Sequence, residues 1–274
     1  MTGEAQAVAP GLHVVATPIG NRRDITLRAL DVLGGADRVL AEDTRRTGLL
    51  LAAYGLEARL VSYHDHNAER VTPMALQWLE SGESLALVSD AGTPLVSDPG
   101  YRLVRAAGEA GHPVHAVPGA SAVLAALSVA GLPTDRFTFA GFLPPKRTAR
   151  RKALEALKGA AGTLVVYETG PRLADALRDM ADVLGAEREA CVARELTKTH
   201  EEVRRGTLSN LIPDEAPKGE IVVLVAPGVA TVWDAAAVDA ALAERAEMRS
   251  KDAAREVAEL SGWRRRDVYN RLVK

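Results

Sequence analysis

Small and polar residues gather where five segments predicted to be buried strands come to an end. Glycine and alanine at such positions let a ligand approach the backbone closely. Asp90 could anchor a hydroxyl or an amine, and the segment after Pro118 begins a helix whose free N–H groups favour a polar ligand. In open α/β sheets ligands bind outside the carboxyl ends of the strands. Five such loops along one sheet predict a shared cleft: TPIGN (17–21), AEDTRRT (41–47), SYHDHN (62–67), SDAGTP (89–94) and VPGASA (117–122).

Several common ligand motifs are absent from the sequence. No Gly-x-Gly-x-x-Gly follows the first strand, and there is no P-loop, no His-Glu-x-x-His and no Gly-x-Ser-x-Gly. His64-Asp65-His66 could supply two metal ligands, but nothing nearby completes a shell, so we interpret the segment as a polar loop and expect no metal. The single Cys191 excludes an internal disulfide and a cysteine-cluster metal site.

Alternating strand and helix patterns in the first half predict a mainly parallel sheet covered by helices. We expect Asp24 to cap the first helix, and a further helix to begin within PGASAVLAAL. The expected strands are residues 12–17, 37–43, 59–63, 84–89 and 113–117, and the other expected helices span about 44–53, 68–80 and 100–110.

The second half has a different pattern, with five strand-like segments and only two good helices between them. It predicts a smaller mixed sheet, with strands at 136–142, 162–168, 190–196, 199–207 and 219–226. After Gly228 no strand pattern remains, and residues 245–274 carry nine Lys/Arg against five Asp/Glu. We therefore predict an α/β protein with an N-terminal domain (11–119), a C-terminal α/β domain (120–228) and a small helical tail domain (229–274).

The bulk composition is that of a globular protein. Among the 274 residues 47% are apolar and only 4% aromatic, so the core must be built from alanine, leucine and valine. A net charge of −2 means that any nucleic-acid surface has to be a local patch. No apolar run approaches the ~20 residues of a membrane span, and the first residues lack signal-peptide features. We expect a soluble cytoplasmic protein.

Eight ordered segments, together with the tail from about residue 248, make the sequence resemble one family. They are LHVVATPIGNRRDITLRAL, AEDTRRTGLLL, SYHDHN, LVSDAGTPLVSDPGYRLV, VPGASA, FAGFLPPK, YETGPRL and ARELTKTHEE, and the resemblance extends from about residue 11 to 226. The family is the ribosomal RNA small-subunit methyltransferase I family, within the tetrapyrrole-methylase-like class. The resemblance implies two α/β domains with S-adenosylmethionine between them. It also implies 2′-O-methylation of a cytidine ribose in 16S rRNA, at position 1402 of the usual rRNA numbering.

The resemblance further implies which residues line the cofactor pocket. The second domain would contribute Tyr167, Glu168 and Leu196. The acidic segment SDP (97–99) is expected to cap the helix at 100–110 instead of touching ligand. From the first domain and the helix start, the implied residues are Pro18, Asp90, Ala91, Gly92, Ser121 and Ala122.

A ribose hydroxyl is a poor nucleophile until a base takes or shares its proton. Among the candidates, Lys198 could have a pKa lowered by burial beside the sulfonium, or it could be a surface lysine paired with Glu195 or Glu201. The sequence does not choose among the possible bases, which are Glu42, Asp43, His64, Glu195 and Lys198.

A basic run at 144–152, PPKRTARRK, contains no acidic residue and is unfavourable at a helix start, so it suggests contact with an RNA backbone. The residues proposed to bind RNA are Lys146, Arg147, Arg150 and Arg151, with Arg22 and Arg45 on the cleft rim. Arg264, Arg265 and Arg266 in the tail could add a contact or could simply end a soluble helix.

The expected partners are 16S rRNA, within the small ribosomal subunit, and a second copy of the chain. Two alternatives remain open at this point. One is a methyltransferase of the same class acting on a tetrapyrrole-type small molecule or on a protein, and the other is a non-catalytic RNA-binding assembly factor. A nucleotide hydrolase is disfavoured because no phosphate-binding glycine loop is present.

Overall fold

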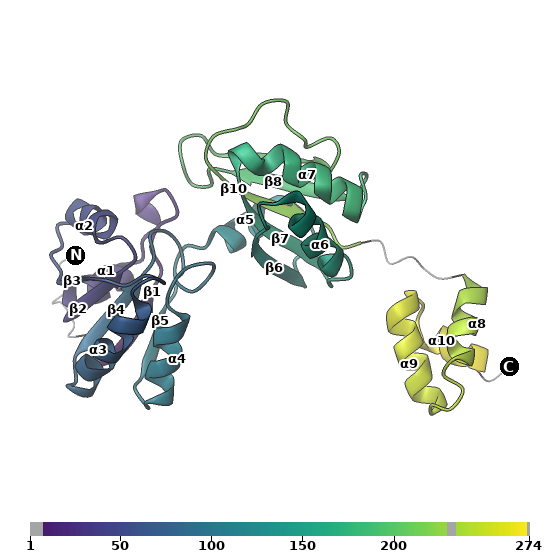
Figure 1. Cartoon of the computed structure of the whole chain (residues 1–274), viewed down its shortest axis with the longest axis horizontal. Coiled ribbons are helices and arrows are strands. Elements are labelled where there is room, and N and C mark those ends of the chain that lie inside the picture. Colours follow the sequence, from purple (N-terminus) through teal and green to yellow (C-terminus); the bar gives the residue numbers. More distant parts are fainter. Residues whose placement is uncertain (1–7, 229–233, 273–274) are drawn as a thin grey trace. The chain divides into compact units, whose positions relative to one another are not determined.

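The structure, a computed structural model, describes residues 8–228 and 234–272. The chain divides into two compact units, Met1–Pro227 and Gly228–Lys274, which are described separately (Figure 1). The first unit contains two five-stranded sheets and the second contains only helices in its described part. The predicted fold class, α/β with a helical C-terminal region, is confirmed. The boundary that we placed between residues 119 and 120 stays a prediction.

The first sheet is entirely parallel, in the order β3-β2-β4-β1-β5. Helices α1 (Leu27–Gly35) and α2 (Thr44–Ala53) pack on one face, and α3 (Ala68–Glu80) and α4 (Tyr101–Glu109) pack on the other. Both faces are covered, which is why the strands read as continuous apolar runs. The strands are β1 (Gly11–Val15), β2 (Arg38–Ala41), β3 (Leu60–Ser62), β4 (Ser84–Val88) and β5 (Val114–Val117).

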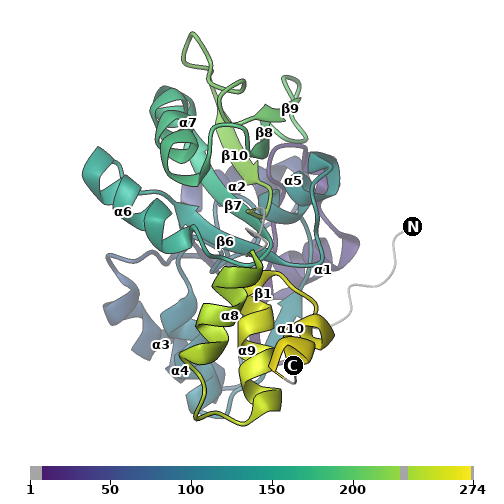
Figure 2. The same cartoon turned by 90° about the vertical axis from the view of Figure 1, so that its right-hand side faces the viewer.

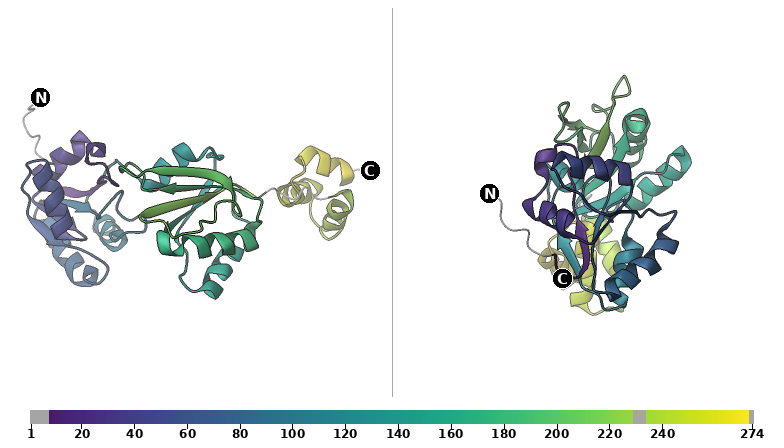
Figure 3. Two further views of the ribbon diagram at one scale, coloured as in Figure 1. Left: turned by 90° about the horizontal axis from the view of Figure 1, so that it is seen from above. Right: turned by 90° about the vertical axis from the view of Figure 1, so that its left-hand side faces the viewer.

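The second sheet is mixed, in the order β6-β7-β10-β8-β9, with only the β6–β7 pair parallel. Helix α5 (Ala122–Ala130) packs on one face, and α6 (Arg147–Leu157) and α7 (Gly170–Leu184) pack on the other (Figure 3). Its strands are β6 (Phe137–Phe142), β7 (Thr163–Thr169), β8 (Glu189–Arg194), β9 (Glu202–Thr207) and β10 (Glu220–Val225).

The second unit has its own small apolar core. Helices α8 (Ala235–Ala243), α9 (Ser250–Ser261) and α10 (Arg265–Leu272) meet around Val238, Val257 and Val268 (Figure 2). Across the ranges 8–228 and 234–272, no helix combines the length and apolar character needed to cross a membrane.

Two details of the predicted elements are wrong. Asp24 does not cap the first helix: it lies in a 3₁₀ turn (Arg22–Asp24), and the side chain of Thr26 caps α1 by accepting from the Ala29 N–H at 3.1 Å. The strand predicted from residue 199 begins only at Glu202, because the preceding segment turns, with Glu195 and Thr197 at positive φ of 50° and 67°.

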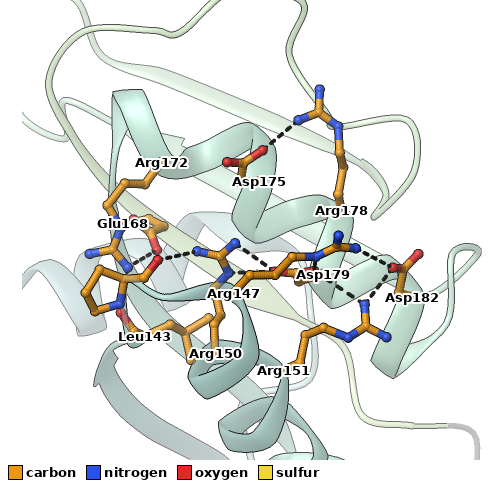
Figure 4. Close-up of polar contacts among 11 residues, drawn as sticks. Leu143, Arg147, Arg150, Arg151, Glu168, Arg172, Asp175, Arg178, Asp179 and Asp182 are labelled. Atoms are coloured by element: carbon orange, nitrogen blue, oxygen red, sulfur yellow. Dashed lines mark hydrogen bonds and ion pairs between the residues drawn. The ribbon is translucent and has the colours of Figure 1, made fainter.

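The basic run that begins α6 has its counter-ions within the protein (Figure 4). The Asp179 carboxylate, on α7 and 1% exposed, accepts from Arg147 Nε at 3.1 Å, Arg150 Nε at 2.8 Å and Arg151 Nη1 at 3.4 Å. Asp182 also accepts from Arg151, at 2.6 Å. The anion that the unfavourable helix start requires is therefore supplied by α7. Since Arg150 is only 4% exposed, its predicted role as a phosphate contact is corrected: it is a buried structural residue.

Burial raises the pKa of Asp179, but the arginine hydrogen bonds and charges outweigh it and hold the pKa below its ordinary value of 3.8. A depressed folded-state pKa means that the ionised carboxylate stabilises the fold at neutral pH. That contribution starts to disappear near the ordinary value and is lost as the pH falls through the lower folded-state pKa. Asp179 thus ties α6 to α7 over the neutral range.

We expect Arg150→Met to lower the free energy of unfolding by about 3 kcal/mol, the lower end of the range for breaking a buried pair, since Arg147 and Arg151 still face Asp179. The matched control is Arg178→Met on α7, whose partner Asp175 is exposed, and it should change stability by less than ~1 kcal/mol. Urea unfolding of both variants measures the difference. Equal effects would mean that the Asp179 cluster contributes no more than a surface ion pair.

Candidate functional site

A cavity of about 260 Å³ lies in the first unit, where loops after β2 and β4 meet strands of the second sheet. This is the edge of the parallel sheet at which the sequence predicted a cleft. Its lining residues are Ile19, Glu42, Arg46, Asp90, Ala91, Gly92, Thr93, Val96, Ser97, Asp98, Ser121, Ala122, Phe142, Tyr167, Glu168, Thr169, Ala193, Leu196, Glu220, Ile221 and Val222.

Two backbone hydrogen bonds join the loops after β1 and β4. The Thr17 N–H donates to the Gly92 carbonyl at 2.9 Å, and the Gly92 N–H donates to the Thr17 carbonyl at 3.0 Å. Gly92 has a φ of 81°, and a Cβ there would lie 3.3 Å from Ile19 Cγ2. Both the positive φ and the closeness of Ile19 favour glycine. At this position only backbone atoms therefore line the cavity.

The start of α5 also faces the cavity. Ser121 is the N-cap residue, its side chain makes no capping hydrogen bond, and both Ser121 and Ala122 line the cavity. The first N–H groups of a helix carry a partial positive charge and have no partner within the helix. They are therefore suited to a carboxylate or a hydroxyl of a bound ligand.

Three carboxylates from the first sheet reach the cavity: Glu42, Asp90 and Asp98. Asp90 accepts from Arg46 Nη1 at 2.7 Å and from the Asp43 N–H at 3.2 Å. Burial raises the pKa of Glu42, and the neighbouring charge of Asp90 adds to the effect. Burial, followed by the charge of Glu42, raises the pKa of Asp98 to about 6. The cavity is thus locally acidic, which suits a ligand that carries positive charge.

Segment 97–99 does not cap α4 as predicted. Because Asp98 had been assigned to that cap, it was not predicted to line the cavity. Gly100 is the N-cap of α4, with no side-chain cap. Leu95 and Ser97 have positive φ of 73° and 65°, a strain of roughly 1–3 kcal/mol each, and Asp98 follows them on the cavity wall. The available signal was the second acidic residue in a long strand-end loop, but a cap and a ligand contact look alike in sequence.

The second sheet forms the opposite wall. Tyr167 contacts Phe139 edge-on, with ring centroids 4.8 Å apart, and Phe142 at 5.4 Å. Glu168 has a fully buried side chain whose carboxylate accepts from Arg172 Nη2 at 3.0 Å and from the Thr169 N–H at 2.9 Å. Phe142 is 53% exposed while lining the cavity, so it offers an aromatic face to a planar ligand.

The structure brings most of the predicted cofactor residues together, since eight of the nine line this cavity. Pro18 does not, although it stands between Thr17, which pairs with Gly92, and Ile19, which lines the cavity. Asp98, Phe142 and Glu220 also line the cavity, although no sequence pattern had indicated them. Contact of any of these residues with a cofactor stays a prediction.

Among the predicted bases only Glu42 lines the cavity. Lys198 instead donates to Glu195 at 2.8 Å and to Glu220 at 2.9 Å. Burial lowers the pKa of its amine, but the two carboxylates outweigh this and raise the pKa above its ordinary value of 10.5. In this structure Lys198 is therefore a protonated ion-pair partner, not the lysine of lowered pKa that we had considered.

Neither Asp43 nor His64 lines the cavity. Asp43 is the N-cap of α2, and hydrogen bonds from the Arg45 side chain and N–H hold its pKa far below the ordinary value. The His64 backbone accepts from the N–H groups of Asn67 and Ala68 where α3 begins. Among residues 8–228 and 234–272, no group of three or more His, Cys, Asp or Glu side chains is placed to hold a metal ion.

Comparison with known proteins identifies the fold and the family. The family model described as Tetrapyrrole (Corrin/Porphyrin) Methylases matches residues 11–212, and the RsmI C-terminal HTH domain matches residues 233–274. Among solved structures, the methyltransferase CobJ (TM-score 0.60, 20% identity, 80% of this chain and 95% of that chain) shares the fold. So does diphthine synthase (TM-score 0.61, 18% identity, 78% of this chain and 89% of that chain).

Two curated relatives are much more similar. A "Ribosomal RNA small subunit methyltransferase I" from Mesorhizobium japonicum is 50% identical over 98% of this chain and 94% of its own length. The protein of that name from Escherichia coli O157:H7 is 46% identical over 94% of this chain and 93% of its own length. With this identity along nearly the whole chain, the protein belongs to the ribosomal RNA small subunit methyltransferase I family, on the tetrapyrrole methylase fold.

Proposed function

We propose that this protein transfers the methyl group of S-adenosylmethionine to the ribose 2′-hydroxyl of a cytidine in 16S rRNA, at position 1402 of the usual rRNA numbering. The observation that carries the proposal is 50% identity over 98% of the chain to a protein named as a ribosomal RNA small subunit methyltransferase. The tetrapyrrole-type or protein-directed alternative is not favoured, because the solved structures with such substrates in their names are 18–23% identical and share only the fold.

The residues of the cavity fit S-adenosylmethionine. A related fold, uroporphyrin-III C-methyl transferase from Thermus thermophilus, was solved in complex with S-adenosyl homocysteine, at 21% identity and a TM-score of 0.55. In this chain, Asp90 and the α5 N-terminus would hold hydroxyl, amine or carboxylate groups, and Phe142 offers a surface for an adenine ring. The carboxylates of Asp90 and Glu42 on the cavity wall suit a cationic sulfonium.

Bound S-adenosylmethionine supplies an activated methyl group whose leaving thioether is neutral, so the protein mainly has to align the reacting atoms. Alignment of this kind lowers a barrier by roughly 7–11 kcal/mol in favourable cases. The Thr17–Gly92 backbone pair ties two loops together and the α5 start is part of a helix, and both restrain the groups that would align the reacting atoms. The hydroxyl proton still requires an acceptor on the protein.

Exposed basic side chains near the cleft remain the proposed RNA contacts. Lys146, Arg147 and Lys152 are exposed at α6, although Arg147 also bonds to Asp179. Arg45 has an 87% exposed side chain beside Asp43. Arg46 lines the cavity, so it adds a third basic residue to the two predicted at the rim, Arg22 and Arg45. The curated relatives are named for ribosomal RNA of the small subunit, which supports the proposal that this protein methylates that RNA within the small subunit, in the cytoplasm.

We also propose that the protein is a homodimer, with the second copy covering an apolar groove of about 410 Å³. The groove lies along β5 and β6, which are edge strands of their two sheets, and beside α5. Edge strands with exposed apolar residues favour association. Leu124 and Phe137 line the groove together with other apolar residues and are 58% and 43% exposed, which makes this a contiguous apolar surface suited to a partner.

For the cofactor, Gly92→Val should weaken S-adenosylmethionine binding at least tenfold, about 1.4 kcal/mol, because the new side chain enters the cavity wall. Gly82→Val is the matched control: Gly82 has the same φ of 81° but open space where a Cβ would be. Isothermal titration calorimetry measures both affinities. An unchanged affinity for Gly92→Val, or an equal loss for both variants, would remove this loop from the binding site.

For RNA, replacing Lys146 and Arg147 by Gln should flatten the slope of log affinity against log salt by at most ~1.4 with single-stranded RNA, since each lost phosphate contact contributes ~0.7. The control replaces Arg102 and Arg105 of α4, two exposed arginines, by Gln and should leave the slope unchanged. Binding is measured at several salt concentrations. Parallel lines for wild type and the α6 variant would show that this end of α6 does not touch the RNA backbone.

For the dimer, Leu124→Glu places a charge in the groove and should yield a monomer in sedimentation velocity. Leu49→Glu, on α2 and 70% exposed, changes the same residue type away from the groove and should leave the dimer intact. A wild-type protein that sediments as a monomer, or a Leu124→Glu variant that stays dimeric, would contradict this interface.

A further inference from the structure

We propose that Asp98 accepts the proton of the attacking ribose hydroxyl, a catalytic role that rests on the 2′-O-methylation proposed above. Neither the position of Asp98 in the sequence nor the helix-capping pattern indicates this role.

Five carboxylates line the cavity, and three of them are held by cations. Asp90 pairs with Arg46, Glu168 with Arg172, and Glu220 with Lys198. Within the described residues, no arginine or lysine forms an ion pair with Glu42 or Asp98. Burial raises the pKa of Glu168, but its side chain is fully buried and both its carboxylate oxygens already accept hydrogen bonds, from Arg172 and from the Thr169 N–H. Of the five, Glu42 and Asp98 are therefore the two carboxylates that have no cationic partner in the described structure and can accept a proton.

The position of Asp98 is set by a loop that spans both sheets. Val96 packs with the hydrophobic cluster of the second sheet, and the Ser97 Oγ lies so close to β6 that a Cβ on Gly141 would be 3.0 Å from it. On the other side, the Gly100 backbone packs against Leu87 of β4. Asp98 stands between these anchors, partly buried, on the wall of the cavity.

The groups that act on Asp98 come from three elements. Glu42 follows β2, Asp90 and the hydrogen-bonding Ser89 follow β4, and Tyr167 lies on β7 with its own pKa raised to about 12 by burial and then by Asp98. Burial and the two carboxylates raise the pKa of Asp98 to about 6, whereas Ser89 lowers it. The carboxylate is therefore ionised at neutral pH but is a better proton acceptor than an ordinary aspartate.

In the proposed step all atoms and electrons are accounted for. The ribose oxygen forms a bond to the methyl carbon, the carbon–sulfur bond of the donor breaks, and sulfur keeps that electron pair. The hydroxyl proton passes to a carboxylate oxygen of Asp98 and afterwards to water. Glu42 acts as a positioning residue: its charge raises the basicity of Asp98 without touching the reacting atoms.

The test is single-turnover methyl transfer to 30S subunits, followed by labelled S-adenosylmethionine from about pH 5 to 9. The wild-type rate should rise tenfold per pH unit and level off above a midpoint near 6. Asp98→Asn should lower the plateau by ~10²-fold or more while cofactor affinity, measured by calorimetry, is retained. Glu42→Gln should move the midpoint to lower pH, because it removes a charge that raises the pKa of Asp98.

A readout that needs no turnover is carbon NMR of protein labelled at aspartate carboxyls. One resonance should titrate near pH 6 in the wild type and in the surface control Asp175→Asn, and it should be missing from Asp98→Asn. If Asp98→Asn does not fold, the wild-type spectrum still tests whether one aspartate titrates near pH 6.

The outcomes separate the two proposals. A wild-type protein that methylates no rRNA would overturn the proposed function. A wild-type protein that methylates 30S subunits, together with an Asp98→Asn variant of equal rate and unchanged pH profile, would overturn only the role of Asp98. Loss of cofactor affinity in Asp98→Asn would also overturn it, because Asp98 would then be a binding residue. Abolished transfer in Glu42→Gln, with Asp98→Asn active, would assign the base to Glu42.

Discussion

The pair of backbone hydrogen bonds between Thr17 and Gly92 is the contact on which the site depends. It joins the loops that leave β1 and β4, the two neighbouring strands at the centre of the parallel sheet. Because the pair involves backbone only, each loop can present small residues to the cavity, and Gly92 does so at a positive φ. The other wall, from β7, β8 and β10, then closes a space lined by both sheets.

Electrostatics divides the acidic residues of the cavity into two groups. Arg46, Arg172 and Lys198 neutralise three carboxylates and fix their orientation, which makes them suited to hold a ligand. Glu42 and Asp98 have no such cation in the described structure, and their pKa values are raised, first of all by burial. One cleft therefore offers both ligand-holding groups and a proton acceptor, because cations occupy three of the carboxylates while burial raises the pKa of the unpaired Glu42 and Asp98.

The arginines of α6 show how a charged run can mislead. A run with no acidic neighbour in sequence has a buried acidic partner, Asp179, on the adjacent helix. Arg150 extends from the α6 turn into this cluster, while Lys146 and Lys152 stay exposed. Only the exposed side chains can meet a phosphate without first breaking a buried ion pair, which is costly.

The sequence by itself determined where most strands lie, that the first sheet is parallel and that the second is mixed. It determined the set of small-residue loops as well. These features follow from periodicity and turn residues, which act locally. It also determined the family, since the ordered segments span nearly the whole chain. Only the tertiary structure decided which charged groups meet. Asp179 reaches the α6 arginines, the Lys198 amine is held by Glu195 and Glu220, and Asp98 turns to the cavity instead of capping α4. The Lys198–Glu195 pair, three residues apart, is local and was among the pairings considered from the sequence. The other partners, Asp179 for the α6 arginines and Glu220 for Lys198, are distant in sequence, so no local pattern encodes them.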